Sequence, residues 1–308
     1  MFDAKTSYYP TFTIGIKLSD TGTDGGASMF DRRTALAMIA GAIASPALSM
    51  AQDSDGFDSL LAEVEADNDK FPGAAGQLEA KELSKVVFGA AQPNYGKAKR
   101  QMNARTIAMI TAFEVSNKKR YEARYRHPFW PGKDSGVTFA IGYDLGYVSK
   151  SGLDADWRNY IDDNARKLLV PVLGLKRTAA RNAVAKVQAV DVGYDVASKQ
   201  FVAETLPKYV AQTDYALPNT AALSDNAIGA LVSLTFNRGP SYLIRPENDP
   251  KGRYAEMREI RRLMKEQRFS DIPAQIRSMK RLWDKNSDVG GLIARREIEA
   301  KLFELATA

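Results

Sequence analysis

The sequence predicts a predominantly helical α+β protein, and three observations support this prediction. Most of the chain after residue 100 falls into stretches with apolar residues at helical spacing. One short run of β-formers, residues 137–143, interrupts this pattern and follows the turn signal Ser135-Gly136. Cysteine is absent, so disulfides, thiolate metal sites and a cysteine nucleophile are excluded. A chain of 308 residues with 44% hydrophobic content is able to bury a substantial core.

The N-terminal region predicts an exported protein. Residues 1–28 are polar, rich in Thr, Gly and Asp, and are expected to be a disordered or untranslated extension before a start at Met29. Residues 29–51 form the predicted export signal, in which Arg32-Arg33 precedes a small-residue run and resembles a twin-arginine signal. The run is too weakly hydrophobic to span a membrane, and a buried Ala-rich helix is the alternative. We therefore expect a periplasmic or secreted protein with no stable membrane insertion after signal removal.

A helix is predicted from Asn103, its N-cap, to Glu114. Residues Ile107, Ile110 and Phe113 supply its apolar stripe. Glu114 lies at the C-terminal end, where the negative end of the helix dipole and apolar neighbours disfavour an ionised carboxylate. A carboxyl group in that position tends to keep its proton, which suits a general acid.

A second carboxylate, Asp144, follows the β-forming run 30 positions after Glu114. A glycosidase needs such a pair of carboxylates, although Asp144 could instead bond the backbone of its own turn. His127 is the only histidine, so a multi-histidine metal site is excluded and a Ser-His-Asp triad would have to use His127. We expect neither metal nor cofactor.

The segment that joins these carboxylates resembles the active-site region of lysozyme-like muramidases, especially the pesticin-like branch. A helix-terminal Glu114 is followed by Ser-Gly-Val-Thr at 135–138 and by Gly-Tyr-Asp-Leu-Gly at 142–146. The resemblance implies that Glu114 is the acid, that Thr138 positions the attacking water and that Asp144 is the second carboxylate.

One residue of this segment departs from the family pattern, and the identity of the second carboxylate has an alternative. Ala140 stands where a small glycine is expected, which bears on the tightness of the hairpin. In phage lysozymes the second carboxylate precedes the threonine, and the corresponding residue here is Asp134, four positions before Thr138. Asp134 also lies in a Pro-Gly turn, where aspartate is common for local reasons.

Two later motifs match the same family in the same order. Leu-Thr-Phe-Asn-Arg-Gly at 234–239 resembles the Phe-Asn-x-Gly helix end of phage-type lysozymes, and residues 291–303 resemble their terminal Gly-Leu-x-x-Arg-Arg-x-x-Glu helix. By this resemblance either Arg295 or Arg296 reaches Glu114, while Glu299 fixes its own helix. Asn237 either faces the glycan cleft or satisfies backbone groups as a cap.

Before these motifs, Leu60, Leu61 and Val64 predict a short helix that ends before Phe71. Further helices are predicted over residues 152–169, 178–190, 198–212 with an interruption at Pro207, 225–236 with Ser224 as N-cap, 254–269 and around 276–283. The helix at 254–269 carries five Lys and Arg side chains opposite its apolar stripe. This face could hold an anionic polymer, or it could be a solvated face with local pairs such as Glu259 to Arg262.

The resemblance implies a lysozyme-like catalytic domain at 101–308, with a small β-hairpin lobe and a larger helical lobe flanking a cleft. Residues 52–100 are expected to be an N-terminal helical or linker segment. The implied activity is hydrolysis of the β-1,4 bond between N-acetylmuramic acid and N-acetylglucosamine, with inversion and carboxylates roughly 6.5–9.5 Å apart.

We expect a monomeric, bacteriolytic enzyme whose partner is the peptidoglycan glycan strand and not a nucleic acid. The net charge of +6 suits an anionic polymer, although a nucleic acid or a membrane surface would give the same signal. A non-catalytic peptidoglycan-binding protein with a lysozyme-like cleft and the killing domain of an exported bacteriocin are the alternatives.

Overall fold

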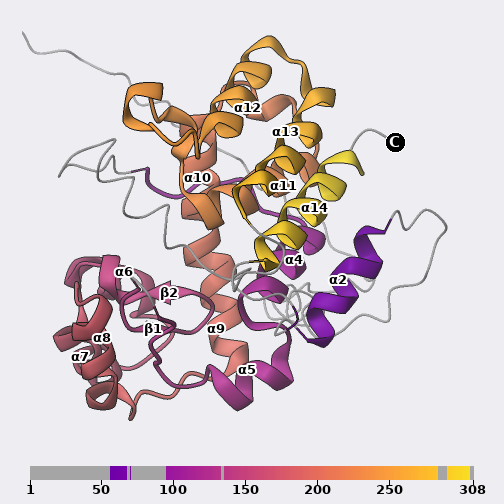
Figure 1. The fold of residues 1–308 in the computed structure, drawn as a ribbon. Coiled ribbons are helices and arrows are strands. Elements are labelled where there is room, and N and C mark those ends of the chain that lie inside the picture. The colour runs from indigo at the N-terminus through magenta and orange to yellow at the C-terminus, as the bar shows by residue number, and fades with distance from the viewer. Residues whose placement is uncertain (1–55, 68–69, 71–94, 133–134, 284–289, 306–308) are drawn as a thin grey trace, which may run out of the picture.

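The computed structural model describes residues 56–67, 70, 95–132, 135–283 and 290–305 (Figure 1). This part of the chain is mostly helical and contains one small antiparallel two-stranded sheet, as the predicted α+β class requires. The predicted extension, the export signal at 29–51 and Asp134 lie outside the described residues. Within the described ranges, no helix has the length and apolar character needed to cross a membrane.

The α-helices, in chain order, are α2 (Phe57–Ala66), α4 (Ala104–Val115), α5 (Lys118–Arg124), α6 (Lys150–Trp157), α7 (Asp163–Leu169), α8 (Arg177–Ala183), α9 (Tyr194–Gln200), α10 (Leu206–Ala216), α11 (Asp225–Arg238), α12 (Ala255–Glu266), α13 (Ile272–Ser278) and α14 (Gly291–Glu304). The strands are β1 (Thr138–Phe139) and β2 (Tyr143–Asp144). Short 3-10 helices join several of these, among them η2 (Leu145–Tyr147).

The hairpin lies beside α6, α7 and α8 in one part of the molecule (Figure 1). Thr138 pairs with Asp144, and Phe139 pairs with Tyr143. The Phe139 and Tyr143 rings both pack on the ring of Trp157, with centroid distances of 4.5 and 5.5 Å. Because opposite residues of a β-pair share a face, Thr138 and Asp144 lie on the other face of the hairpin, away from this aromatic core.

The helix α11 lies at the centre of the helical part of the molecule. Every residue from Ala227 to Arg238 is buried, and Ser224 caps the helix by accepting from the N–H of Ala227. It packs against α4, α10 and α14. At Gly229 the approach of α4 is so close that a Cβ would lie 1.8 Å from the Thr106 hydroxyl. Glycine is therefore required for the contact between α4 and α11.

One long helix runs from the hairpin part to the part that contains α11, α12 and α14 (Figure 1). It consists of α9, a π-helical turn at Phe201–Thr205, and α10. The sequence predicts an interruption at Pro207, but the helix continues because Pro207 lies at the start of α10, directly after the wide π turn. Proline lacks an N–H and is tolerated where the preceding turn does not require one.

The predicted helix at 152–169 is two helices in the structure, α6 and α7. Asp162 accepts from the N–H of Ala165 and so starts a new helix inside the predicted one. The helix predicted at 178–190 is shorter, because α8 ends at Ala183 and continues as a 3-10 turn to Val187. At the N-terminal side, α2 packs against α4 and α14 and so joins the same body.

Candidate functional site

Glu114 lies in the last turn of α4, as predicted. Asn103 caps the helix by accepting from the N–H of Thr106 at 2.9 Å, and Phe113 is fully buried. Beyond the helix end, the hydroxyl of Ser116 donates to the carbonyl of Val64 in α2 at 3.2 Å. The end of α4 is therefore fixed by α2, which leaves Glu114 little freedom of position.

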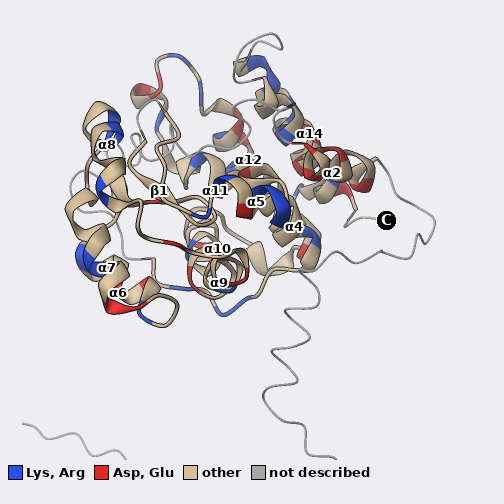
Figure 2. Cartoon of the chain, turned by 90° about the horizontal axis from the view of Figure 1, so that it is seen from below, with Lys and Arg blue, Asp and Glu red and all other residues tan. Residues whose placement is uncertain are grey.

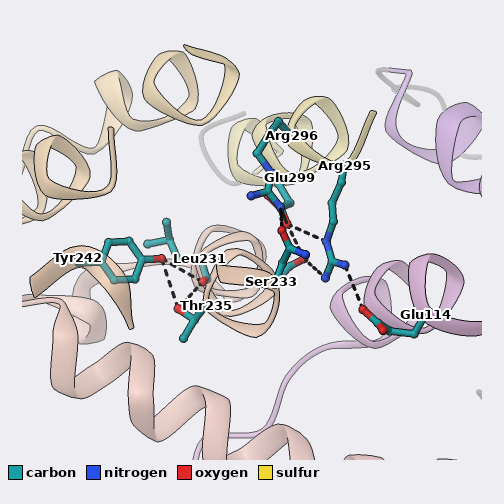
Figure 3. Close-up of polar contacts among 9 residues, drawn as sticks. Glu114, Leu231, Ser233, Thr235, Tyr242, Arg295, Arg296 and Glu299 are labelled. Carbon is teal, nitrogen blue, oxygen red and sulfur yellow. Dashed lines mark hydrogen bonds and ion pairs between the residues drawn. The ribbon is translucent and has the colours of Figure 1, made fainter. Parts of the chain in front are cut away.

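The carboxylate of Glu114 forms a buried ion pair with Arg295 of α14 (Figure 3). The Nη1 atom of Arg295 donates to Oε1 of Glu114 at 3.0 Å; the two side chains are 0% and 6% exposed. The guanidinium also lies 5.2 Å from the centroid of the Phe113 ring. A nearby cation favours the charged form of a carboxyl group, which opposes the effects of burial and of the helix dipole.

Behind this ion pair lies a buried polar network between α11 and α14 (Figure 3). Glu299 accepts at Oε1 from Ser233 at 2.7 Å and from Arg296 at 2.9 Å, and the Nε atom of Arg295 lies 3.4 Å away. Arg296 also donates to Oδ1 of Asn237 at 3.1 Å. Residues three and four positions apart share a helix face, so α14 presents this set to Ser233 and Asn237 of α11.

The two arginines have different partners in this network. Arg295 is the one that contacts Glu114, whereas Arg296 bonds Glu299 and Asn237. Asn237 is buried, and its side-chain oxygen accepts a hydrogen bond from Arg296. Complete burial, which disfavours a charge, lowers the pKa of Arg296 to about 10, and the neighbouring Glu299 partly offsets this effect.

Thr138 and Asp144 are brought together by the register of the hairpin. The N–H of Leu145 donates to the carbonyl of Val137 at 2.9 Å, so Thr138 and Asp144 form a non-hydrogen-bonded pair. Side chains are closest in such pairs, with Cβ atoms about 4.5–5.5 Å apart. The Thr138 hydroxyl is buried and has no hydrogen-bond partner among the described residues. A buried hydroxyl without a partner is costly unless water or a ligand satisfies it.

Asp144 also fixes the local backbone. Its Oδ1 atom accepts from the N–H of Gly136 at 3.1 Å and from that of Gly146 at 2.8 Å. The two glycines are close-packed, because a Cβ on Gly136 would lie 2.5 Å from Oδ1 of Asp144 and 2.3 Å from the nitrogen of Gly146. The backbone role considered for Asp144 from the sequence is therefore present.

The turn between the strands contains a strained residue. Ala140 has a φ of 52°, in the left-handed region that favours glycine, and Gly142 has a φ of 66°. An L-residue in this region costs about 1–2 kcal/mol. The alanine at position 140, where glycine was expected, therefore introduces backbone strain into the hairpin that carries Thr138 and Asp144.

Two cations of the basic face of α12 pair with nearby carboxylates. Arg258 bonds Asp249 at 2.8 Å, and Arg262 pairs with Glu259 and Glu266. These pairs favour the solvated-face interpretation over a polymer-binding one. Within the described ranges no three His, Asp or Glu side chains are grouped so as to hold a metal ion.

The sequence did not indicate one buried network next to the site. The hydroxyl of Tyr143 donates to Asp156 of α6 at 2.7 Å, and Lys208 of α10 donates to the same carboxylate at 2.6 Å. Burial, together with Asp156, raises the pKa of Tyr143. Lys208 lies just after the π turn, so the network connects the hairpin to the long helix. No local pattern in the sequence predicts this three-way contact.

Comparison with known proteins assigns no family. A scan against protein-family models and a search of curated proteins found no match to the chain. The functional interpretation therefore depends on the residues of the site.

Proposed function

We propose that the chain is a peptidoglycan hydrolase of the muramidase class, cleaving the β-1,4 bond between N-acetylmuramic acid and N-acetylglucosamine. The observation that carries the proposal is the buried contact between Glu114 and Arg295. It joins the helix-end glutamate and the terminal-helix arginine, two motifs 181 positions apart that the family resemblance pairs. The observed helical class with one small hairpin is compatible with a lysozyme-like arrangement of two lobes around a cleft.

In this mechanism Glu114 protonates the departing glycosidic oxygen. Arg295 holds Oε1 and so orients the carboxyl group. A guanidinium can only donate hydrogen bonds, so Oε1 stays an acceptor and the proton that Glu114 takes up before the transfer has to be on Oε2. Arg295 is a positioning residue, and Glu299 fixes it from the side opposite Glu114.

Thr138 and Asp144 would orient the attacking water on the other side of the sugar. The buried Thr138 hydroxyl has no partner among the described residues and is suited to bind that water. Asp144, the residue opposite, is fixed through Oδ1 by two backbone N–H groups. A water between the two carboxylates predicts inversion at the anomeric carbon.

A non-catalytic peptidoglycan-binding protein is the second candidate. One observation favours it, since the two backbone hydrogen bonds to Asp144 give this residue a structural role that needs no reaction.

Substitution of Glu114 by Gln tests the proposal. The amide keeps the size of the side chain and an acceptor for Arg295 but cannot donate the proton, so we expect kcat to fall about 10²–10⁴-fold. The measurement is release of reducing ends from purified peptidoglycan, with NMR of the anomeric product. Lys265→Ala, which removes an exposed charge on α12, serves as a control that keeps full activity. Absence of reducing ends with the unsubstituted protein would favour the binding candidate.

We also propose that the protein is exported to the periplasm or secreted, and that it acts on the glycan strand as a monomer. The proposal of export rests on the Arg32-Arg33 pair and the small-residue run that follows it. N-terminal sequencing of protein recovered outside the cytoplasm, starting after Ala51, is the expected result. A cytoplasmic chain that retains Met1 would contradict it.

A further inference from the structure

A surface of cations and aromatic rings borders the turn that carries Asp144. We call it the cation–aromatic surface, and it consists of Trp130, Tyr147, Lys176, Arg177 and Arg181. These residues come from the loop after α5, from the 3-10 helix η2, from α8 and from the N-cap position immediately before α8. Figure 2 shows Lys and Arg on α8, close to β1.

Each aromatic ring of this surface makes a cation–π contact with one of its cations. The Nζ atom of Lys176 lies 3.6 Å from the centroid of the Tyr147 ring, and the guanidinium carbon of Arg181 lies 5.9 Å from that of Trp130. Lys176 and both aromatic rings are half-buried, whereas Arg181 is exposed. Cation–π contacts of this kind restrict the cations, so that less entropy is lost when they bind an anion.

Short backbone links join the cation–aromatic surface to the candidate site. The carbonyl of Ser135 accepts from the indole Nε1 of Trp130 at 3.1 Å and from the N–H of Arg177 at 3.0 Å. The next residue, Gly136, donates its N–H to Asp144. The surface is therefore fixed one residue away from the turn that holds the Asp144 carboxylate.

The loop before α8 makes a second link. The N–H of Gly174 donates to the carbonyl of Leu145 at 3.0 Å. A Cβ on Gly146 would lie 2.9 Å from the carbonyl oxygen of Leu175, so this loop packs directly on the turn after Asp144. The position of Lys176 relative to Asp144 is thus fixed both by the Ser135 contacts and by the packing of residues 174–175 on the turn after Asp144.

We infer that the cation–aromatic surface binds a carboxylate carried by the glycan at the Asp144 side of the site. This inference rests on the proposed function. Lys and Arg form charge-assisted hydrogen bonds with carboxylates. In peptidoglycan, such a carboxylate comes either from the lactyl group of an N-acetylmuramic acid without a stem peptide or from the stem peptide, whose attachment converts the lactyl carboxylate into a neutral amide. Neutral N-acetylglucosamine polymers have neither group, so the surface would discriminate against them.

A single-stranded nucleic acid fits the geometry less well. Binding of that class uses open aromatic faces on which bases stack. Here the Lys176 ammonium covers one face of the Tyr147 ring at 3.6 Å. The rings position cations, which is what recognition of an isolated carboxylate requires.

The test measures binding by calorimetry in the full chain with Glu114→Gln, so that ligands are not consumed. The ligands are a disaccharide-peptide fragment of peptidoglycan, the same disaccharide with a free lactyl carboxylate, and neutral chitotetraose. Adding Lys176→Ala and Arg181→Ala should weaken binding of an acidic ligand about tenfold. Chitotetraose affinity should not change, and adding Lys265→Ala instead should change nothing. Weakening for the peptide fragment alone assigns the stem-peptide carboxylates, and weakening for the free-lactyl disaccharide alone assigns the lactyl carboxylate. Weakening for both shows that the surface accepts a carboxylate from either source.

Four results would overturn the inference. The first two are no binding of either acidic ligand, and unchanged affinity for the acidic ligands after Lys176→Ala and Arg181→Ala. The other two are a weakening of chitotetraose binding as large as that of the acidic ligands, and binding of oligothymidylate that is tighter than that of the acidic ligands and is lost through the same substitutions. Matching circular dichroism and melting temperatures show that the variants remain folded. The two proposals fail separately. If the unsubstituted protein releases no reducing ends but the binding pattern holds, only the hydrolase proposal falls. Hydrolysis combined with unchanged acidic-ligand affinities removes only the present inference.

Discussion

Replacing Arg295 by Met removes a fully buried charge from the candidate site. The side chain of Arg295 is 0% exposed, and it contacts Glu114 at 3.0 Å and Glu299 at 3.4 Å. These two carboxylates are 6% and 0% exposed, so removal of the guanidinium leaves both with less compensation inside the protein. Breaking a buried pair from one side costs about 3–5 kcal/mol of the free energy of unfolding.

Arg262→Met provides a matched comparison on α12. Arg262 also pairs with two glutamates, Glu259 and Glu266, but its side chain is 46% exposed. Solvent screens such pairs, and we expect a loss of about 0–1 kcal/mol. Urea unfolding at neutral pH, followed by circular dichroism, measures both values.

A second substitution separates lost charge compensation from lost packing. Adding Glu114→Gln to Arg295→Met removes one of the carboxylates left without its partner, so part of the lost stability should return. Equal losses for Arg295→Met and Arg262→Met, or no recovery in the double variant, would refute the view that Glu114 and Arg295 form a buried, mutually compensating pair.

Two more predictions concern the hairpin and acid stability. Ala140→Gly should raise the free energy of unfolding by about 1 kcal/mol, because glycine adopts the positive φ of 52° without strain; lower stability in urea would contradict this. Burial alone would raise the pKa of Asp249, but hydrogen bonds from backbone N–H groups and from Arg258 lower it overall. Asp249 therefore stabilises the fold above its unfolded pKa of about 3.9, and this contribution is lost as pH falls through its lower folded pKa. Asp249→Asn should flatten the decline of stability in that acid range, and an unchanged decline would contradict the assignment.

Helices with complete local signals were predictable from the sequence. Asn103 and Ser224 cap α4 and α11 as expected, and apolar residues at helical spacing mark both helices. The break between α6 and α7 at Asp162 was not predicted because apolar residues continue at helical spacing across it. That spacing predicts one continuous helix, although Asp162 is a residue type that commonly caps helices. The π turn before Pro207 was missed because a proline by itself predicts an interruption and not a compensating wide turn.

The candidate site was predictable only where a motif accompanied it. Glu114, Thr138 and Asp144 stand in a recognisable order, and Arg295 belongs to a second motif. By contrast, the contact between Lys208 and Asp156 joins helices 52 positions apart with no periodic signal. Tertiary packing alone places that pair.

Asp144 has two roles that a single substitution separates. Holding the turn requires only that Oδ1 accept from the N–H groups of Gly136 and Gly146. In Asp144→Asn the amide oxygen still accepts both bonds, so the turn persists, while the charge needed to activate a water is removed. We expect the free energy of unfolding to change by less than about 1 kcal/mol and the release of reducing ends to fall at least about 10²-fold. Full activity together with full stability would reduce Asp144 to its structural role, and the second carboxylate would then have to come from another residue.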